Sequence, residues 1–244
     1  MMKMDKLSLV ILVLIGLSWS MDNGNYTYTK EELMGIVSPK RDSNFVRVEA
    51  KYANRTGMYL QKDAYNAFKR MYQAAKRDHI SLKIVSAFRS FYHQKYIWEA
   101  KWTGKRKVDG QNLSQTIPDA FLRAKKILLY SSMPGSSRHH WGTEVDLNEL
   151  DNEYFAHGEG KKIYNWLVNH AAEYGFCQPY TANRSFGYQE EKWHWSYLPL
   201  AKSMLLAYQK LIRIDDFKGF QGAEEADSVH IISHYVLGIN KQCK

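Results

Sequence analysis

The chain has 244 residues, of which 45% are hydrophobic and 14% aromatic, which is enough apolar material for one sizeable core. Its formal net charge of +9 favours anionic surfaces such as nucleic acid or envelope polymers, although a solvated basic surface explains the charge equally well. The basic residues are scattered, and no helix-turn-helix, zinc-finger or RNP pattern is present, which argues against a nucleic-acid-binding protein.

The N-terminus has the pattern of a secretory signal peptide. Lys3 and Lys6 precede an apolar run over residues 7–17, and small residues follow it at the spacing that signal peptidase reads. The run is shorter than the ~20 residues that cross a bilayer, so a cleaved signal over residues 1–20 is favoured over a permanent anchor. We therefore expect export to the periplasm or cell envelope, with no membrane span after cleavage.

The two cysteines, Cys177 and Cys243, both lie in the part that would be exported. In an oxidising compartment they can form one disulfide that ties the C-terminal tail to the domain. The sequence leaves two free thiols open as the alternative.

After the signal peptide, we expect a short lead-in over residues 21–55 and then a catalytic domain over residues 56–244. Residues 21–55 are polar and mixed, with little periodic structure. Apolar residues at three- and four-residue spacing then predict a helix over 62–78. A strand over 82–88 and an aromatic-rich helix over 91–102 place Arg89 at a strand-to-helix turn, where side chains are commonly presented to a cleft.

The second half alternates helices and strands after a surface excursion over residues 103–119. The expected elements are a helix over 120–130, a turn over 133–137, a strand over 143–148, a helix over 161–174, a strand around Trp193-His194-Trp195, a helix after Pro199 and a last helix over 229–237. We expect an α+β fold with a small central antiparallel sheet flanked by helices, and a C-terminal helical extension.

His139 and Asp146 form the first half of a predicted metal site, which would lie in a cleft on the sheet. Asp146 shares a strand face with Glu144, and Gly142 permits a tight turn that swings His139 round to meet it. His140 is adjacent to His139, and spacing alone does not choose between the two.

His194 supplies the second half of the site. Two imidazoles and one carboxylate leave a position open for water, as a catalytic zinc requires. Glu191 lies three residues before His194, close enough to take the proton of the attacking water and return it to the leaving amine. His230 and His234 have ligand-like spacing, but no acidic residue lies between them, so a solvated helix face is favoured.

These motifs match a known family. The pattern Ser137-x-His139-x-x-Gly142-x-x-x-Asp146, together with Glu191-x-Trp193-His194, resembles the signature of the VanY-like D-alanyl-D-alanine carboxypeptidases. That group of zinc peptidases also includes D,D-dipeptidases and L,D-carboxypeptidases. The segment Ser86–Ser90, with Gln94 beyond it, is similar to the family's substrate-binding strip, and the resemblance spans Leu60 to Pro199.

The resemblance implies a role for each residue. Zn²⁺ would be bound by His139, Asp146 and His194, with Glu191 as general base and acid. Arg89 would stabilise the oxyanion or clamp the substrate carboxylate. Gln94 and Ser137 would hydrogen-bond the terminal carboxylate.

Glu144 departs from the family pattern, in which a small or apolar residue is usual. It either disturbs the metal site or points to solvent beside the cleft, and we expect the solvent-facing position.

The expected function is a zinc-dependent D-alanyl-D-alanine carboxypeptidase that removes the terminal D-Ala of peptidoglycan stem peptides. An L,D-carboxypeptidase or an endopeptidase of the same fold is an alternative. A zinc-stabilised wall-binding module without turnover is another, which Glu191 beside His194 disfavours. We expect a monomer with peptidoglycan stem peptides as partner and no nucleic acid, since export separates the two.

Overall fold

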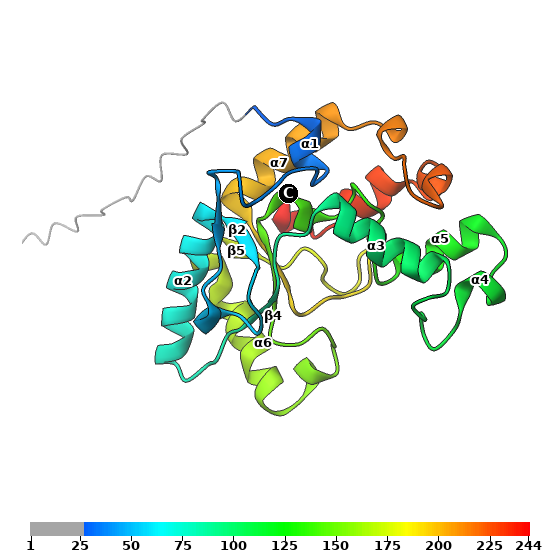
Figure 1. Cartoon of the computed structure of the whole chain (residues 1–244). Helices are drawn as coiled ribbons and strands as arrows, with labels where there is room; N and C mark the ends of the chain where they lie inside the picture. Colours follow the sequence, from blue (N-terminus) through cyan, green and yellow to red (C-terminus); the bar gives the residue numbers. More distant parts are fainter. Residues whose placement is uncertain (1–26) are drawn as a thin grey trace, which may run out of the picture.

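The computed structural model describes residues 27–244, and the expected signal peptide over residues 1–20 lies outside them. The α+β prediction is confirmed: short antiparallel strands lie between helices on both sides (Figure 1). None of the helices in the described part of the chain is long and apolar enough to cross a membrane.

The helices and strands expected from the sequence appear in the expected order, together with short elements that the sequence did not predict. The helices are α1 (Lys30–Leu33), α2 (Lys62–Arg77), α3 (Phe91–Trp102), α4 (Leu113–Thr116), α5 (Ala120–Leu128), α6 (Gly158–His170) and α7 (Leu198–Leu211). The strands are β1 (Phe45–Arg47), β2 (Tyr59–Gln61), β3 (Ile84–Ser86), β4 (Glu144–Leu147), β5 (Phe176–Cys177) and β6 (His194–Tyr197). Strands β1 and β2 form one hairpin-like pair, and the other four form a sheet of order β3-β4-β6-β5, antiparallel throughout.

The two faces of the four-stranded sheet differ in polarity. Val145 and Leu147 point to one face and pack with Trp195 of β6 in an apolar cluster. Because side chains alternate along a strand, the residues between them point to the opposite face. Glu144 and Asp146 therefore share the polar face on which the metal site was expected.

The apolar face is covered by α2 and α6. Apolar residues recur along α2 at three- and four-residue spacing, so that Ala67, Phe68 and Met71 are fully buried. Burying a side chain the size of Phe or Met stabilises the fold by about 1.5–3 kcal/mol. Leu167 of α6 is also fully buried in this cluster.

A second core lies on the other side of the sheet and includes the C-terminal segment. Helices α3, α5 and α7 pack there with residues from 212–244, and the Trp98 indole donates a hydrogen bond to the Gln221 carbonyl (2.8 Å). The last helix, expected over 229–237, is a single π-helical turn at Ile231–Val236. Cys243, which is fully buried, forms a disulfide with Cys177.

The N-terminal lead-in is short of regular structure, as expected, yet it packs against the domain. Strand β1 pairs with β2, and the Trp141 indole donates to the Leu33 carbonyl at the end of α1 (3.1 Å). The lead-in therefore supports the segment that carries His139.

Candidate functional site

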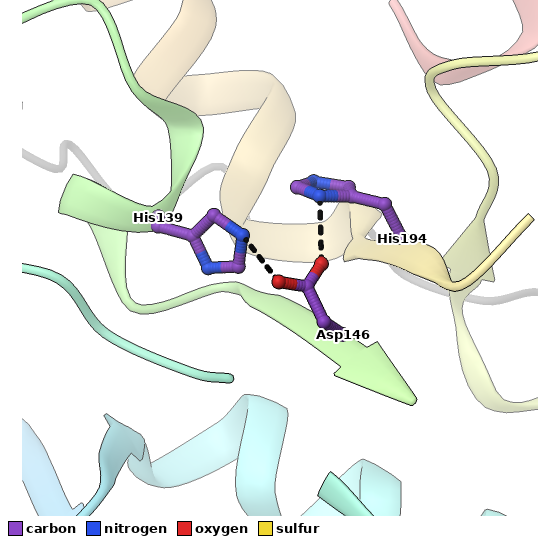
Figure 2. Close-up of side chains that lie close together, drawn as sticks. All are labelled: His139, Asp146 and His194. Atoms are coloured by element: carbon purple, nitrogen blue, oxygen red, sulfur yellow. Dashed lines mark ion pairs between the residues drawn. The ribbon is translucent and has the colours of Figure 1, made fainter. Parts of the chain in front are cut away.

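The three predicted metal ligands lie together on the polar face of the sheet (Figure 2). Asp146 Oδ2 is 3.2 Å from His139 Nε2, and Asp146 Oδ1 is 3.0 Å from His194 Nδ1. One ligand atom from each residue lies within 4.8 Å of the others. All three side chains are buried, so a cation among them would be largely removed from bulk solvent.

Strand register explains why Asp146 and His194 meet. Asp146 of β4 stands directly opposite His194 of β6, and Ser86 of β3 stands opposite Asp146 on its other side. Directly opposed residues on one face of an antiparallel pair have neighbouring side chains. A row of three residues from three separate segments is thus assembled by backbone pairing alone.

His139 reaches the same point through a tight turn. It lies on the 3₁₀ turn Arg138–Trp141, which ends at Gly142 with φ of 70°, in the left-handed region. A Cβ at Gly142 would also collide with the ring of Phe45. Both the backbone conformation and the lack of space for a Cβ atom therefore favour glycine where the chain turns into β4.

His140 lies outside this group, because both of its ring nitrogens have partners elsewhere. Its Nδ1 lies 2.5 Å from the Arg89 carbonyl, and its Nε2 accepts a hydrogen bond from the Gly135 amide (3.1 Å). Burial lowers the pKa of His140 to about 3, so the ring is neutral, with the proton on Nδ1. His140 therefore braces the Arg89 turn from behind.

The outer nitrogen of each ligand histidine has its own acceptor. His139 Nδ1 lies 2.8 Å from the Ala87 carbonyl, and His194 Nε2 lies 2.9 Å from Glu144 Oε2. When those nitrogens carry the protons, the opposite nitrogens turn their lone pairs toward Asp146. This is the tautomer pair that a metal between the three residues requires.

The chemistry of these donors fits zinc. Two imidazole nitrogens and a carboxylate are a standard donor set for catalytic Zn²⁺. Asp146 Oδ1 is buried and receives no hydrogen bond of good geometry within the part of the chain that the structure describes. An oxygen in that position is free to bind a metal ion.

The electrostatics also favour a cation. Burial alone would lower the pKa of His194, but the close carboxylates of Asp146, Glu144 and Glu191 raise it well above the usual value. Burial would raise the pKa of Asp146, yet the neighbouring imidazoles of His139 and His194 hold it well below the usual range. The carboxylates around His194 therefore favour a positive charge at this point, and a metal ion would compete with a proton for it.

Glu191 lies at the mouth of the metal site. Its Oε2 is 3.4 Å from His194 Nδ1, and its side chain is 17% exposed, so it faces both the ligands and the cleft. The Glu191 amide donates to the Tyr180 carbonyl (2.9 Å), and Gln178 Nε2 donates to the Glu191 carbonyl (3.1 Å). These two bonds fix a residue that lies before the first residue of β6.

A cleft of about 490 Å³ opens over the triad and Glu191. Its walls come from the turn after β3, from α3, from the segment 129–132, from residues 150–152 and from residues 180–191. Two residues that the sequence analysis did not single out belong to it. Tyr180 packs its ring 4.7 Å from the ring of His194, and Lys101 projects into the cleft from α3.

The predicted substrate-binding residues occupy different positions. Arg89 and Ser137 line the cleft. Gln94 is fully buried behind Arg89: its Oε1 accepts from Arg89 Nη1 (2.9 Å), and its Nε2 donates to the Ser132 carbonyl (2.7 Å). Arg89 Nη2 also donates to Ser86 Oγ (3.1 Å) and lies 4.0 Å from Asp146 Oδ2, so the guanidinium is held beside the triad.

The expectation that Glu144 points to solvent is wrong. Its side chain is fully buried, because its face of the sheet is covered by Arg138 and by the second core. Burial alone would raise its pKa, but the charge of Arg138 and the hydrogen bond with His194 lower it to about 2. Strand alternation carried the missed signal: Glu144 stands opposite Ser196, one row away from Asp146 and His194.

His230 and His234 take no part in this site. His230 is exposed, and His234 stacks on the ring of Phe186 with centroids 4.1 Å apart. Among the residues from 27 onward, the triad is the one group of three or more potential ligands that could hold a metal ion.

Comparison with known proteins identifies the family of the chain. Residues 57–200 match the sequence model of the family described as VanY, D-alanyl-D-alanine carboxypeptidase. A Bacillus subtilis (strain 168) protein named "Putative carboxypeptidase YodJ" is 30% identical over 198 residues, which is 77% of this chain. The chain spans 60% of the length of that relative.

The fold resembles that of one solved structure, and a second solved structure aligns less closely. An LD-carboxypeptidase, LdcB, aligns with a TM-score of 0.51 and 23% identity over 77% of this chain and 79% of its own. A vancomycin-resistance D,D-pentapeptidase VanY variant in complex with Zn(II) aligns with a TM-score of 0.48 and 23% identity, over 68% of this chain and 90% of that one.

Proposed function

Because the chain belongs to the VanY D-alanyl-D-alanine carboxypeptidase family, we propose that it is a zinc-dependent carboxypeptidase that removes terminal D-Ala from peptidoglycan stem peptides. The observation that carries the proposal is the buried group of His139, Asp146 and His194 at the base of a cleft, with Glu191 beside it. Asp146 offers a carboxylate oxygen without a hydrogen-bond partner among the residues that the structure describes, and His139 and His194 each direct a ring nitrogen toward this carboxylate, which together make a donor set for a catalytic metal ion.

In this proposal His139 Nε2, Asp146 and His194 Nδ1 hold the zinc. The ion, when bound, acts as a Lewis acid that polarises the scissile carbonyl and makes a water molecule more acidic. Glu191 takes the proton of the attacking water and delivers it to the departing amine of D-Ala. Its position 3.4 Å from His194 Nδ1, one of the proposed ligand atoms, supports this role.

Arg89 binds negative charge on the substrate. Burial lowers its pKa, but Asp146 and Glu191 oppose that effect, and a guanidinium remains charged at any physiological pH. The paired N–H donors of its planar guanidinium can bind the terminal carboxylate of the peptide or the oxyanion that forms on the attacked carbonyl.

Gln94 and Ser137 serve the same end of the substrate. Gln94 acts through Arg89, since its amide is occupied by Arg89 and by the Ser132 carbonyl. Ser137 lines the cleft next to His139 and offers its hydroxyl to the terminal carboxylate.

We also propose that the protein is exported to the periplasm or cell envelope. The pattern over residues 1–20 supports export, and the Cys177–Cys243 disulfide suits an oxidising compartment. Cell fractionation with an antibody should recover the protein outside the cytoplasm, and recovery in the cytoplasm would contradict this assignment.

The test of the function is release of free D-Ala from defined stem peptides. The purified protein, zinc-loaded or treated with a chelator, is incubated with a pentapeptide ending in D-Ala-D-Ala and with the corresponding tetrapeptide. Chelator-sensitive release from the pentapeptide is the expected result, and release from the tetrapeptide alone would identify an L,D-carboxypeptidase instead. Internal peptide fragments without free D-Ala would point to an endopeptidase, and no cleavage of either peptide would contradict the proposal.

A further inference from the structure

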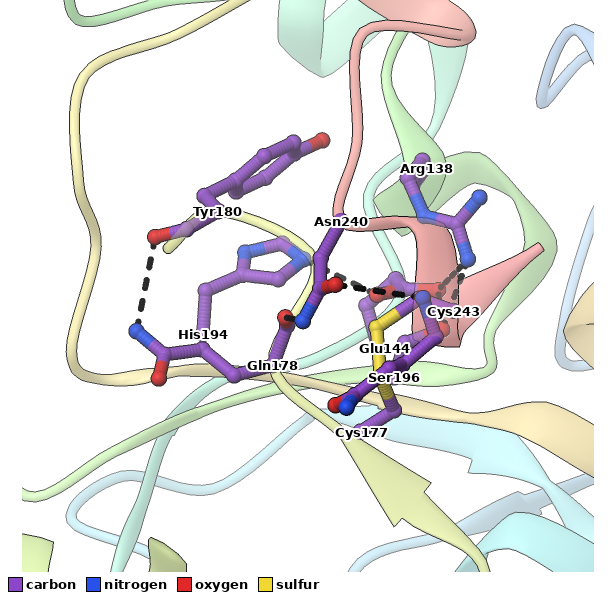
Figure 3. Close-up of a disulfide and its surroundings, with 10 residues drawn as sticks. Arg138, Glu144, Cys177, Gln178, Tyr180, His194, Ser196, Asn240 and Cys243 are labelled. Carbon is purple, nitrogen blue, oxygen red and sulfur yellow. Dashed lines mark hydrogen bonds and ion pairs between the residues drawn. A yellow bond between two sulfur atoms is a disulfide. The ribbon is translucent and has the colours of Figure 1, made fainter. Parts of the chain in front are cut away.

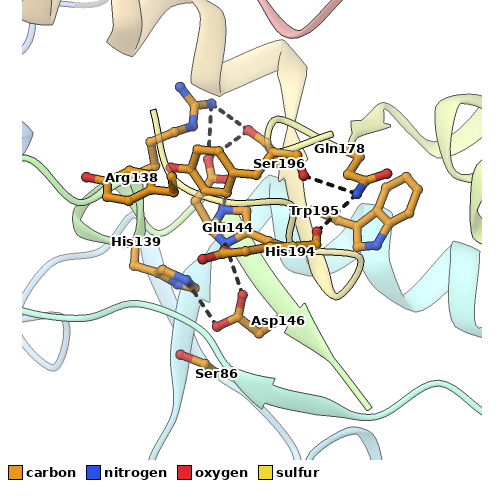
Figure 4. Close-up of polar contacts among 12 residues, drawn as sticks. Ser86, Arg138, His139, Glu144, Asp146, Gln178, His194, Trp195 and Ser196 are labelled. Carbon is orange, nitrogen blue, oxygen red and sulfur yellow. Dashed lines mark hydrogen bonds and ion pairs between the residues drawn. The ribbon is translucent and has the colours of Figure 1, made fainter. Parts of the chain in front are cut away.

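A closed polar network lies behind His194, on the side away from Asp146 (Figure 4). Glu144 Oε1 accepts from Ser196 Oγ (2.7 Å) and lies 3.2 Å from Arg138 Nη2, while Arg138 Nη2 also donates to Ser196 Oγ (2.7 Å). Glu144 Oε2 is left to face His194 Nε2 at 2.9 Å. The two carboxylate oxygens therefore have separate partners.

The network is costly to bury. The side chains of Arg138 and Glu144 are both 0% exposed, and Arg138 Nε and Nη1 find no hydrogen-bond partner among residues 27–244. Moving two charges out of water often costs more than their mutual attraction returns. Replacing a buried ion pair by packed apolar residues of the same volume is often neutral for stability, so stability alone is a weak account of these residues.

The geometry points to a role at the metal site, and this inference rests on the proposed zinc function. We propose that Glu144 is a positioning residue that fixes His194 as a zinc ligand through Nδ1. An accepted Nε2–H bond sets the tautomer, fixes the ring plane and makes Nδ1 a better donor to a metal.

Arg138 and Ser196 complete the device. Their contacts with Oε1 hold the carboxylate of Glu144 in place, so that Oε2 stays directed at His194. Glu144 lies on the far side of the His194 ring from Asp146, and it therefore acts through the ring and does not itself bind the metal.

The two imidazole ligands are supported unequally. His139 Nδ1 faces the Ala87 carbonyl, a neutral acceptor supplied by the backbone. His194 Nε2 faces an ionised carboxylate, which is the stronger acceptor. A substitution can therefore remove the acceptor behind His194, which is the Glu144 side chain, whereas the acceptor behind His139 is a backbone carbonyl that substitution leaves in place.

The test measures zinc affinity directly by competing apo-protein against a chromophoric chelator. Glu144→Gln should weaken zinc binding by about 10- to 100-fold. Thr143→Val is the matched control: Thr143 donates to Glu144 Oε1 (3.0 Å), so its loss leaves the Oε2–His194 bond in place, and zinc affinity should stay within about two-fold of wild type.

Glu144→Gln leaves Arg138 without its counter-charge, so the double variant Arg138→Met/Glu144→Leu is measured alongside it. That variant removes both charges while preserving a packed core, and it should fold and show the same weakened zinc binding. ¹⁵N spectra of the His194 ring report the tautomer, with Nε2–H and a metal-bound Nδ1 expected in the zinc-loaded wild type.

Wild-type zinc affinity in both Glu144 variants, or a wild-type ring bound through Nε2, would overturn the positioning role. A wild-type protein that binds no zinc at all would instead overturn the proposed function, so the two failures are distinguishable.

Discussion

Removing the Cys177–Cys243 disulfide should lower the stability of the protein by an amount that follows from the length of chain it closes. The two cysteines are 66 residues apart in the sequence. Closing a loop of that length in the unfolded chain costs conformational entropy, which corresponds to about 4 kcal/mol of stability in the native protein. The double variant Cys177→Ser/Cys243→Ser should therefore unfold at a clearly lower urea concentration than the oxidised wild type.

The same disulfide lies beside Gln178 and Asn240 (Figure 3), which connect it to the segment that carries Glu191, the proposed general base. Gln178, the neighbour of Cys177, donates to the Glu191 carbonyl, and the Asn240 amide donates to the Pro179 carbonyl (2.8 Å). Loss of the disulfide should therefore reduce kcat more than it reduces zinc occupancy.

Urea unfolding curves, with kcat and bound zinc measured on the same samples, test both parts. The reduced wild type serves as control and should behave like the double variant. An unfolding free energy within about 1 kcal/mol of the oxidised wild type would refute the loop argument, because the entropic term would then be absent.

Two further substitutions test the cleft. Arg89→Lys keeps the charge but loses the fork that contacts Gln94 and Ser86; kcat/KM should fall by about 10²–10³ with zinc affinity unchanged, and steady-state kinetics near wild type would contradict its role. Burial, with the charges of Arg106 and Arg89, lowers the pKa of Lys101 from 10.5 to about 8. The unfolded chain thus binds a proton that the folded protein releases, so unfolding free energy should rise with pH between about 8 and 10.5. Lys101→Met should flatten that rise and stabilise the protein at pH 7. Urea unfolding of both proteins at pH 7 and pH 10 tests this, and an equal rise in unfolding free energy in the variant and the wild type would contradict it.

The closeness of His139 and Asp146, two of the three candidate ligands, could be predicted because its signals are local. Gly142 between His139 and Asp146 marks the turn, and β-strand alternation fixes the face of Asp146. The third ligand, His194, is distant in the sequence, and its inclusion depended on the motif that contains Glu191. The structure supplies the missing reason, because β4 and β6 pair with Asp146 opposite His194.

The residues that surround the candidate ligands could not be predicted from local sequence patterns. The position of Glu144 depends on what covers its face of the sheet, and that cover comes from Arg138 and from the distant Ser196. The sequence shows a carboxylate near the metal site, but strand pairing and burial decide whether it faces solvent or a histidine ring. The same holds for Gln94, whose partner Ser132 lies 38 residues away.

The C-terminal segment shows a similar limit. Its apolar residues predicted a regular helix over 229–237, whereas tertiary packing leaves a single π-helical turn. The Cys177–Cys243 pairing likewise required the distance between the two residues, which is 5.8 Å between Cα atoms.

The variant Glu191→Gln tests the proposed mechanism directly, with bound zinc and D-Ala release measured on the same preparation. Gln keeps the size of the side chain and removes its ability to accept the proton. If Glu191 is the general base, zinc occupancy should equal that of wild type and D-Ala release should fall by about 10²–10⁴. Normal release with zinc bound would contradict Glu191 as the general base and, with it, the proposed mechanism.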